Sequence, residues 1–172
     1  MRNTQKENVA EHSFMTAMIA HALCVISNEL YGGKLNADRA ATLALYHEAA
    51  EVLTGALPTP VKYHNDGIRS VYKAMEREAE KKIVGVLPEN LKSVYEPLVS
   101  PDTTQSEYKY VKFADKIAAL IKCNEELSVG NNEFKMAADA MLKSLRAVPD
   151  KAVEYFLNNF ISSFGLSLDE SL

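Results

Sequence analysis

The sequence predicts an all-α protein, and two observations favour this fold class. Glycine and proline are scarce, with seven and six residues in a chain of 172, and runs of β-branched residues are nearly absent. Apolar residues recur every three or four positions, the spacing that places them on one face of a helix. The length corresponds to one domain of ordinary size. We therefore expect a single-domain helical bundle.

Glycine, proline and capping residues divide the first part of the chain into three helices. Gly32 ends the first helix, because glycine adopts the backbone conformation that terminates a helix. Asn36 caps the start of the second helix, and Gly55 followed by Pro58 prevents its continuation. The third helix is highly charged, which indicates an exposed face. The three helices are expected over residues 8–30, 36–53 and 66–86.

The second part of the chain contains four further helical segments. Thr104 and Glu107 have the spacing of a capping box at the start of the longest of them. Gly165 ends the last segment. The four segments are expected over residues 88–98, 104–130, 133–147 and 150–164.

Composition and charge exclude several classes of protein. Lysine and arginine total 19 against 23 acidic residues, giving a net charge of −4, whereas a nucleic-acid polymer requires a basic surface. We expect no membrane span, since no apolar run approaches ~20 residues, and no secretion signal. Cys24 and Cys123 are too few for a disulfide scaffold. We therefore expect a cytoplasmic protein.

Helical phase separates the four histidines. His12 and His47 follow the apolar positions of their helices and are expected to point inward, whereas His21 is expected to face solvent. His64 lies in a polar stretch without apolar register. A single inward histidine is more often a hydrogen-bonded core residue than a ligand. The expected apolar face of the first helix comprises Met15, Met18, Ile19, Ala22, Leu23 and Ile26.

Three carboxylates accompany the inward histidines. Glu48 is adjacent to His47, and Glu51 follows three residues later, so all three are expected on one side of the second helix. Asp115 falls in the apolar line of its own helix, where an unpaired carboxylate is costly and requires a cation. Two simpler interpretations stay open: the glutamates form a solvated edge, and Lys116 or Lys122 pairs with Asp115.

A divalent metal site accounts for these residues together. Two imidazoles and two carboxylates would converge from three helices, a donor set that suits Mn, Fe, Co, Ni or Zn. Such a metal would lower the pKa of a bound water and hold a phosphate oxygen. Glu51, one turn from the ligands, would handle the proton. The expected ligands are His12, His47, Glu48 and Asp115.

Longer stretches around these residues resemble the HD-domain phosphohydrolases, and most closely the bacterial 5′-deoxynucleotidases of the YfbR type. The resemblance covers nearly the whole chain in one register. The matching stretches are Met1–Asn3, Glu7–Ser13, Leu45–Gly55, Leu57–Tyr63, Val111–Asp115, Ile121–Leu127, Gly130–Phe134 and Ser163–Glu170.

The resemblance implies an HD-type helical bundle over residues 1–172 and a homodimer. It also implies hydrolysis of deoxyribonucleoside 5′-monophosphates to deoxynucleoside and phosphate, with a divalent metal, usually cobalt or manganese. The family's metal ligands fall on the four residues expected above, and its catalytic carboxylate falls on Glu51. In the leading hypothesis Asp115 is also catalytic, because it orients the water and assists proton transfer. Its nucleotide-contacting loop falls on Ala56, Leu57, Pro58 and Thr59.

The sequence departs from the family's pattern in three places. Glu48 stands where the family has aspartate, and Ala56 replaces an aspartate that the family places near the sugar. We also expect the family's N-terminal helix, with an arginine for the phosphate and a tryptophan beside the sugar, to be missing or shortened. These departures favour, as an alternative, a catalytically weak HD-fold module that binds a nucleotide or a metal. The last alternative is an HD hydrolase of another phosphoester, such as a nucleoside triphosphate or a cyclic nucleotide.

Overall fold

The computed structural model describes residues 2–4, 6–55 and 65–165, and all regular elements in these ranges are helices. The predicted fold class, all-α, is confirmed. In chain order the elements are α1 (Val9–Tyr31), α2 (Ala37–Tyr46), α3 (Glu51–Thr54), α5 (Asp66–Gly85), α6 (Glu89–Val99), α7 (Ser106–Ser128), the 3₁₀ helix η1 (Asn132–Phe134), α8 (Lys135–Arg146), α9 (Lys151–Asn159) and the 3₁₀ helix η2 (Ile161–Gly165).

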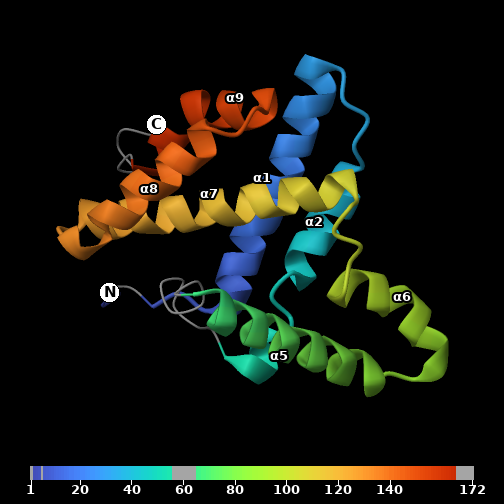
Figure 1. The fold of residues 1–172 in the computed structure, drawn as a ribbon. Helices are drawn as coiled ribbons and strands as arrows, with labels where there is room; N and C mark the ends of the chain where they lie inside the picture. Colours follow the sequence, from blue (N-terminus) through green and yellow to red (C-terminus); the bar gives the residue numbers. More distant parts are fainter. Residues whose placement is uncertain (1, 5, 56–64, 166–172) are drawn as a thin grey trace.

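The two longest helices, α1 and α7, cross at the centre of the molecule, and the other helices pack around this crossing (Figure 1). α2 lies beside α1 and also contacts α7, while α9 packs against α1 and α8 packs against α7. α5 and α6 pack against each other and contact the rest of the fold through α3 and α2.

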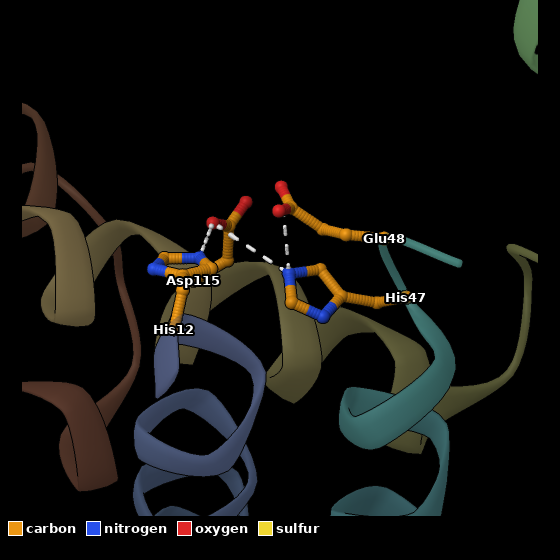
Figure 2. Close-up of side chains that lie close together, drawn as sticks. All are labelled: His12, His47, Glu48 and Asp115. Atoms are coloured by element: carbon orange, nitrogen blue, oxygen red, sulfur yellow. Dashed lines mark hydrogen bonds and ion pairs between the residues drawn. The ribbon is translucent and has the colours of Figure 1, made fainter. Parts of the chain in front are cut away.

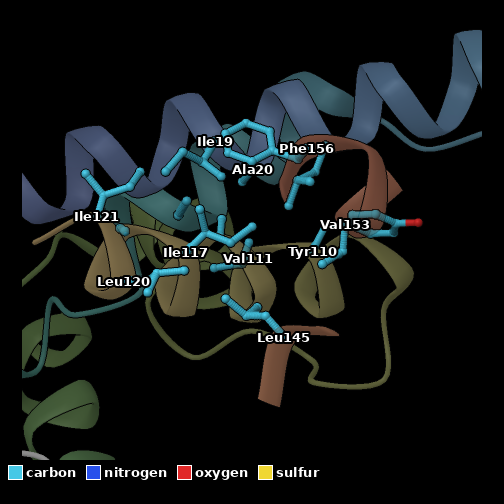
Figure 3. Packing of buried hydrophobic residues seen from close by; sticks show 14 of the residues in the cluster. Ile19, Ala20, Tyr110, Val111, Ile117, Leu120, Ile121, Leu145, Val153 and Phe156 are labelled. Atoms are coloured by element: carbon cyan, nitrogen blue, oxygen red, sulfur yellow. The ribbon is translucent and has the colours of Figure 1, made fainter. Parts of the chain in front are cut away.

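The core is formed by apolar side chains from α1, α2, α7, α8 and α9 (Figure 3). Ile19 and Ala20 of α1 face Val111 and Ile117 of α7, and all four are at most 3% exposed. Burying one side chain of leucine or isoleucine size stabilises the fold by about 1.5–3 kcal/mol. This packed crossing fixes the position of α1 relative to α7, and thereby the positions of the polar side chains at its edge.

Local interactions define both ends of α1. The Asn8 side chain accepts hydrogen bonds from the N–H groups of Ala10 and Glu11, and the Glu11 carboxylate accepts the N–H of Asn8 at 3.0 Å. This reciprocal arrangement is a capping box. Gly32 ends the helix at a φ of 71°, in the left-handed region that glycine adopts without strain. His12 follows the cap by one turn, and its N–H donates to the Asn8 carbonyl.

The buried face of α1 differs from the predicted one. Met18 is 58% exposed, so its assignment to the apolar face is wrong. Small side chains lie between α1 and its neighbours, which allows α2 and α7 to approach closely. The buried residues are Ser13, Thr16, Ala17, Ile19, Ala20, Leu23, Cys24, Ile26 and Ser27.

By length and composition alone, α1 could also cross a membrane, which corrects our expectation that no segment would meet this criterion. The core helix of a soluble protein passes the same test. In this fold α1 contacts α2, α7 and α9, and six of its nine buried side chains belong to the shared apolar core.

The predicted capping box of α7 does not form. Gln105 occupies the N-cap position without a side-chain hydrogen bond, and Thr104 donates to Asp102. The Glu107 carboxylate instead accepts the backbone N–H of Asn36 at 3.0 Å. A tertiary partner therefore replaces the local one and ties the start of α2 to the first turn of α7.

Two predicted segments near the C-terminus are divided. The segment expected over residues 133–147 contains η1 before α8, and the segment expected over 150–164 becomes η2 after α9 ends. Asp150 caps α9 by accepting the N–H groups of Ala152 and Val153, and it also accepts the Tyr110 hydroxyl at 3.0 Å. This contact fixes the start of α9 against α7.

Candidate metal centre

Four side chains that are far apart in the sequence meet where α1, α7 and the end of α2 come together. His12 comes from α1, Asp115 from α7, His47 from the C-cap of α2, and Glu48 from the turn that follows. One ligand atom from each residue lies within 4.8 Å of the others. Figure 2 shows contacts from Asp115 to both imidazole rings and from Glu48 to His47. The structure therefore brings the four expected ligands into one cluster.

The His12 ring contacts neighbours on both of its nitrogens. Nε2 lies 3.2 Å from Asp115 Oδ1 and 3.4 Å from Thr16 Oγ1, and Nδ1 lies 3.9 Å from Glu7 Oε2. Burial lowers the pKa of His12, but the surrounding carboxylates, with Asp115 foremost, outweigh burial and raise it. The ring is therefore held in a strongly negative environment.

The His47 ring is almost completely buried, with 1% of its side chain exposed. Its Nδ1–H donates to the Ala44 carbonyl at 2.6 Å, so that Nε2 is the nitrogen with a lone pair whenever the ring is neutral. Nε2 is buried without a hydrogen-bond partner among the described residues, and it lies 3.8 Å from both Glu48 Oε1 and Asp115 Oδ1. Because buried polar atoms are normally paired, this nitrogen indicates a site for a bound ligand.

Asp115 offers its two oxygens to different partners. Oδ1 faces the two histidines, whereas Oδ2 lies 3.9 Å from Lys112 Nζ. Burial raises the pKa of Asp115, but the hydrogen bond from His12 and the neighbouring positive groups hold the pKa well below its usual range. The carboxylate is therefore ionised at neutral pH, as a metal ligand must be.

The segment after α2 differs from the continuous helix that the sequence predicts. α2 ends at Tyr46, and residues 47–50 form a turn before α3 begins at Glu51. N–H groups in this region donate to carbonyls three residues back, including Glu51 to Glu48 at 2.9 Å. Residues three apart are eclipsed in such tight turns. Glu51 therefore stays on the side of Glu48, although it is not one of the four clustered residues.

Other candidate residues from the sequence lie apart from the cluster or outside the described residues. His21 is exposed, as predicted, and its Nε2 lies 3.6 Å from Asp38. Lys122 pairs with the buried Glu126 at 3.4 Å, so the simpler pairing of this lysine with Asp115 is wrong. The described ranges exclude His64 and the expected substrate-loop residues Ala56, Leu57, Pro58 and Thr59.

Sequence reasoning missed two charged neighbours of the cluster, Lys112 and Glu7. Lys112 precedes Asp115 by three residues on the same helix, and this spacing alone could have predicted their contact. Glu7 precedes the N-cap of α1, so no helical phase could place its carboxylate beside His12.

The four clustered side chains could hold a divalent metal ion. Two imidazole nitrogens and two carboxylate oxygens suit Mn, Fe, Co, Ni or Zn. The bond from His47 Nδ1–H to a backbone carbonyl is the outer contact that commonly orients a metal-bound histidine. The donor set and the unpartnered Nε2 of His47 therefore both fit a metal.

Comparison with known proteins identifies relatives along nearly the whole chain. Residues 1–164 match the family model of YfbR-like 5′-deoxynucleotidases. A 5′-deoxynucleotidase of Klebsiella pneumoniae and the 5′-deoxynucleotidase YfbR of Salmonella paratyphi B are each 49% identical to this chain over 171 residues, covering 99% of this chain and 86% of each relative.

The structural comparison agrees with the sequence comparison. The fold is similar to that of an HD-domain phosphohydrolase from Listeria innocua, with a TM-score of 0.82 and 25% sequence identity. The similarity covers 95% of this chain and 79% of that one. The resemblance stated from the sequence is confirmed, and the chain belongs to the YfbR-like 5′-deoxynucleotidase family of HD-domain phosphohydrolases.

Proposed function

We propose that this protein removes the 5′-phosphate from deoxyribonucleoside monophosphates in a reaction that depends on cobalt or manganese. The observation that carries the proposal is His47 Nε2, which is buried without a hydrogen-bond partner in the described part of the chain and lies beside three further side chains that could bind a metal. The relatives named 5′-deoxynucleotidases support the choice of substrate. The likeness to an HD-domain phosphohydrolase supports hydrolysis of a phosphoester.

The proposed metal ligands are His12, His47, Glu48 and Asp115. A divalent metal, when bound, lowers the pKa of a coordinated water and offsets negative charge on the phosphate oxygens. Glu48 is one methylene longer than the family's aspartate, yet its Oε1 reaches within 3.8 Å of His47 Nε2. The longer side chain can therefore still point at the common centre.

Two carboxylates of the chain are proposed to act on the attacking water. Asp115 orients it by accepting one of its hydrogens, and Glu51 takes the proton as a general base when the water attacks phosphorus. Glu51 is half-buried, and its N–H bond to the Glu48 carbonyl holds it one tight turn from a proposed ligand. As the P–O bond breaks, the 5′-oxygen leaves in line and takes a proton from solvent, and Glu51 returns the proton it accepted to solvent.

Recognition of the deoxynucleoside is proposed for Ala56, Leu57, Pro58 and Thr59. Thr59 offers a hydroxyl to the sugar or the phosphate, whereas Ala56 offers no hydrogen-bonding side chain where the family has aspartate. Discrimination between deoxyribose and ribose therefore has to be measured separately from phosphate hydrolysis.

Phosphate release from dAMP and AMP tests the proposed activity. The protein is stripped of metal with a chelator, Co or Mn is added back, and inorganic phosphate is measured. We expect metal-dependent release from dAMP and little from AMP. Release from both would support phosphatase chemistry and remove the deoxyribose preference. No release by metal-loaded protein would contradict the proposed activity and favour the binding module.

The variant Glu51→Gln separates proton transfer from metal binding. Because general acid–base groups contribute roughly 10²–10⁴-fold to rate, we expect a loss of that size in turnover with unchanged metal content. Glu29→Gln, on the exposed end of α1, is the matched control. Turnover at the parental rate in Glu51→Gln would assign proton transfer to another group.

The remaining parts of the proposal are a single HD domain over residues 1–172, a cytoplasmic location and a homodimer. The apolar groove between α1 and α2 supports the dimer, since Phe14, Met18 and Leu45 are each more than half exposed there. A second copy covering this groove would remove apolar surface from water. Light scattering should show a dimer that Met18→Glu converts to monomer. A monomeric parent, or a dimer unaffected by this change, would contradict this assignment.

A further inference from the structure

A lysine stands beside the metal cluster and is not among the four ligands. Lys112 lies on α7 one turn before Asp115, and its Nζ is 3.9 Å from Asp115 Oδ2. The two histidines face the other oxygen, Oδ1. Lys112 therefore approaches the cluster from a different direction than the imidazole rings.

The Lys112 ammonium is held by contacts but keeps access to solvent. Nζ lies 5.6 Å from the centre of the Tyr108 ring, which precedes it by one turn, and the Lys112 side chain is 48% exposed. A half-exposed ion pair of this kind contributes little to folding stability. Structural support for α7 is therefore a weak explanation for a lysine at this place.

The negative charge around the cluster calls for a positive group beside a bound phosphate, and Lys112 can supply it. Glu48 and Asp115 are acidic, and Glu7 lies 3.9 Å from His12, whereas a phosphate monoester brings further negative charge to the same place. Lys122 is only 12% exposed and lies 3.4 Å from the buried Glu126, so a substrate in solvent has little access to its ammonium. Lys112 combines proximity to the cluster with an ammonium that solvent, and hence a substrate, can reach.

We propose that Lys112 is a substrate-binding residue whose ammonium contacts an oxygen of the phosphate group during binding and turnover. This inference rests on the proposed function, because it takes a phosphate monoester as the ligand of the cluster. Lysine suits the role as a compact charge on a flexible stem, and the contacts with Tyr108 and Asp115 keep it near the site before substrate arrives.

The test uses Lys112→Gln, with Lys116→Gln as the matched control. Lys116 is an exposed lysine one turn further along α7. Affinity for inorganic phosphate is measured by calorimetry on metal-loaded protein, and affinity for the metal is measured in parallel. Because a hydrogen bond to a charged group is worth a factor of roughly 10–100 in affinity, we expect phosphate binding to weaken by about that factor in Lys112→Gln. Metal affinity should not weaken, Lys112→Arg should restore part of the phosphate affinity, and Lys116→Gln should behave like the parent.

Unchanged phosphate affinity in Lys112→Gln would overturn the inference. So would weakening of metal and phosphate binding in equal measure, which would mean that Lys112 acts through Asp115. A parent protein that binds no phosphate would overturn it as well. Phosphate binding needs no turnover. A parent inactive on dAMP whose phosphate binding depends on Lys112 would therefore contradict the proposed deoxynucleotidase and support the lysine contact. In an active enzyme, Lys112→Gln should raise KM for dAMP more than it lowers kcat.

Discussion

Replacing His47 with alanine removes the buried nitrogen that the proposed metal would bind. The side chain is 1% exposed, its Nδ1–H donates to Ala44, and its Nε2 has no hydrogen-bond partner among the described residues. The variant therefore loses a ligand, one hydrogen bond and core volume together. The stabilisation by metal has to be separated from the other two losses.

The expected size of the metal contribution follows from linkage. A ligand that binds only the folded protein stabilises it by about 2.7 kcal/mol when its free concentration is 100 times Kd. For a chain of this length, that corresponds to a rise in Tm of roughly 5–11 °C. The lost hydrogen bond to Ala44 costs about 1 kcal/mol whether or not metal is present.

Thermal unfolding with and without metal separates these contributions. Each protein is unfolded in chelator and again with excess Mn or Co, and the metal-induced rise in Tm is compared. The parent should show the rise, and His47→Ala should show little or none while also melting lower in chelator. His21→Ala is the matched control, because His21 is an exposed histidine outside the cluster. A full metal-induced rise in His47→Ala would refute the assignment of His47 as a ligand.

Three further predictions concern the fold around the site. Asn8→Ala should lower the free energy of unfolding by about 1 kcal/mol, because the cap of α1 is lost, and urea titration measures it. The pKa of Asp150 is lowered, because Lys109 and Tyr110 outweigh the effect of burial. The contribution of ionised Asp150 to folding stability should therefore be complete at pH 7 and decline below about pH 4. The difference in free energy of unfolding between the parent and Asp150→Ala should shrink at pH 3. Glu126→Ala should lower the free energy of unfolding by about 3 kcal/mol, since it breaks the buried ion pair between Glu126 and Lys122. It should also speed proteolysis near Thr4, whose N–H and hydroxyl this carboxylate binds.

The sequence alone was sufficient where the deciding interactions are local. Asn36 caps the start of α2 and Gly32 ends α1, and each acts through hydrogen bonds to groups only a few residues away. The positions of these two helix ends could therefore be predicted. Glu107 has the spacing of a local cap, but it bonds to a backbone N–H 71 residues away. The predicted burial of Met18 was wrong for a related reason. Periodicity indicates that a helix has an apolar face, but the packing of neighbouring helices decides which of its residues are covered.

The candidate site shows the same division. Helical phase predicted the inward direction of His12 and His47, because phase depends only on position in the helix. The distances between the four clustered groups depend on the crossing of α1 and α7, which no single helix specifies. The unpartnered nitrogen of His47 is likewise visible only in the fold, since it requires both the bond to Ala44 and the burial by neighbouring helices.

The most direct test of the central claim is the anomalous scattering of a crystal soaked in manganese. We predict one strong peak about 2.0–2.2 Å from one nitrogen or oxygen atom of each of His12, His47, Glu48 and Asp115, the range of metal–nitrogen and metal–oxygen bonds. The peak should be lost in crystals of His47→Ala. A peak elsewhere, with these four side chains free of metal, would contradict the account.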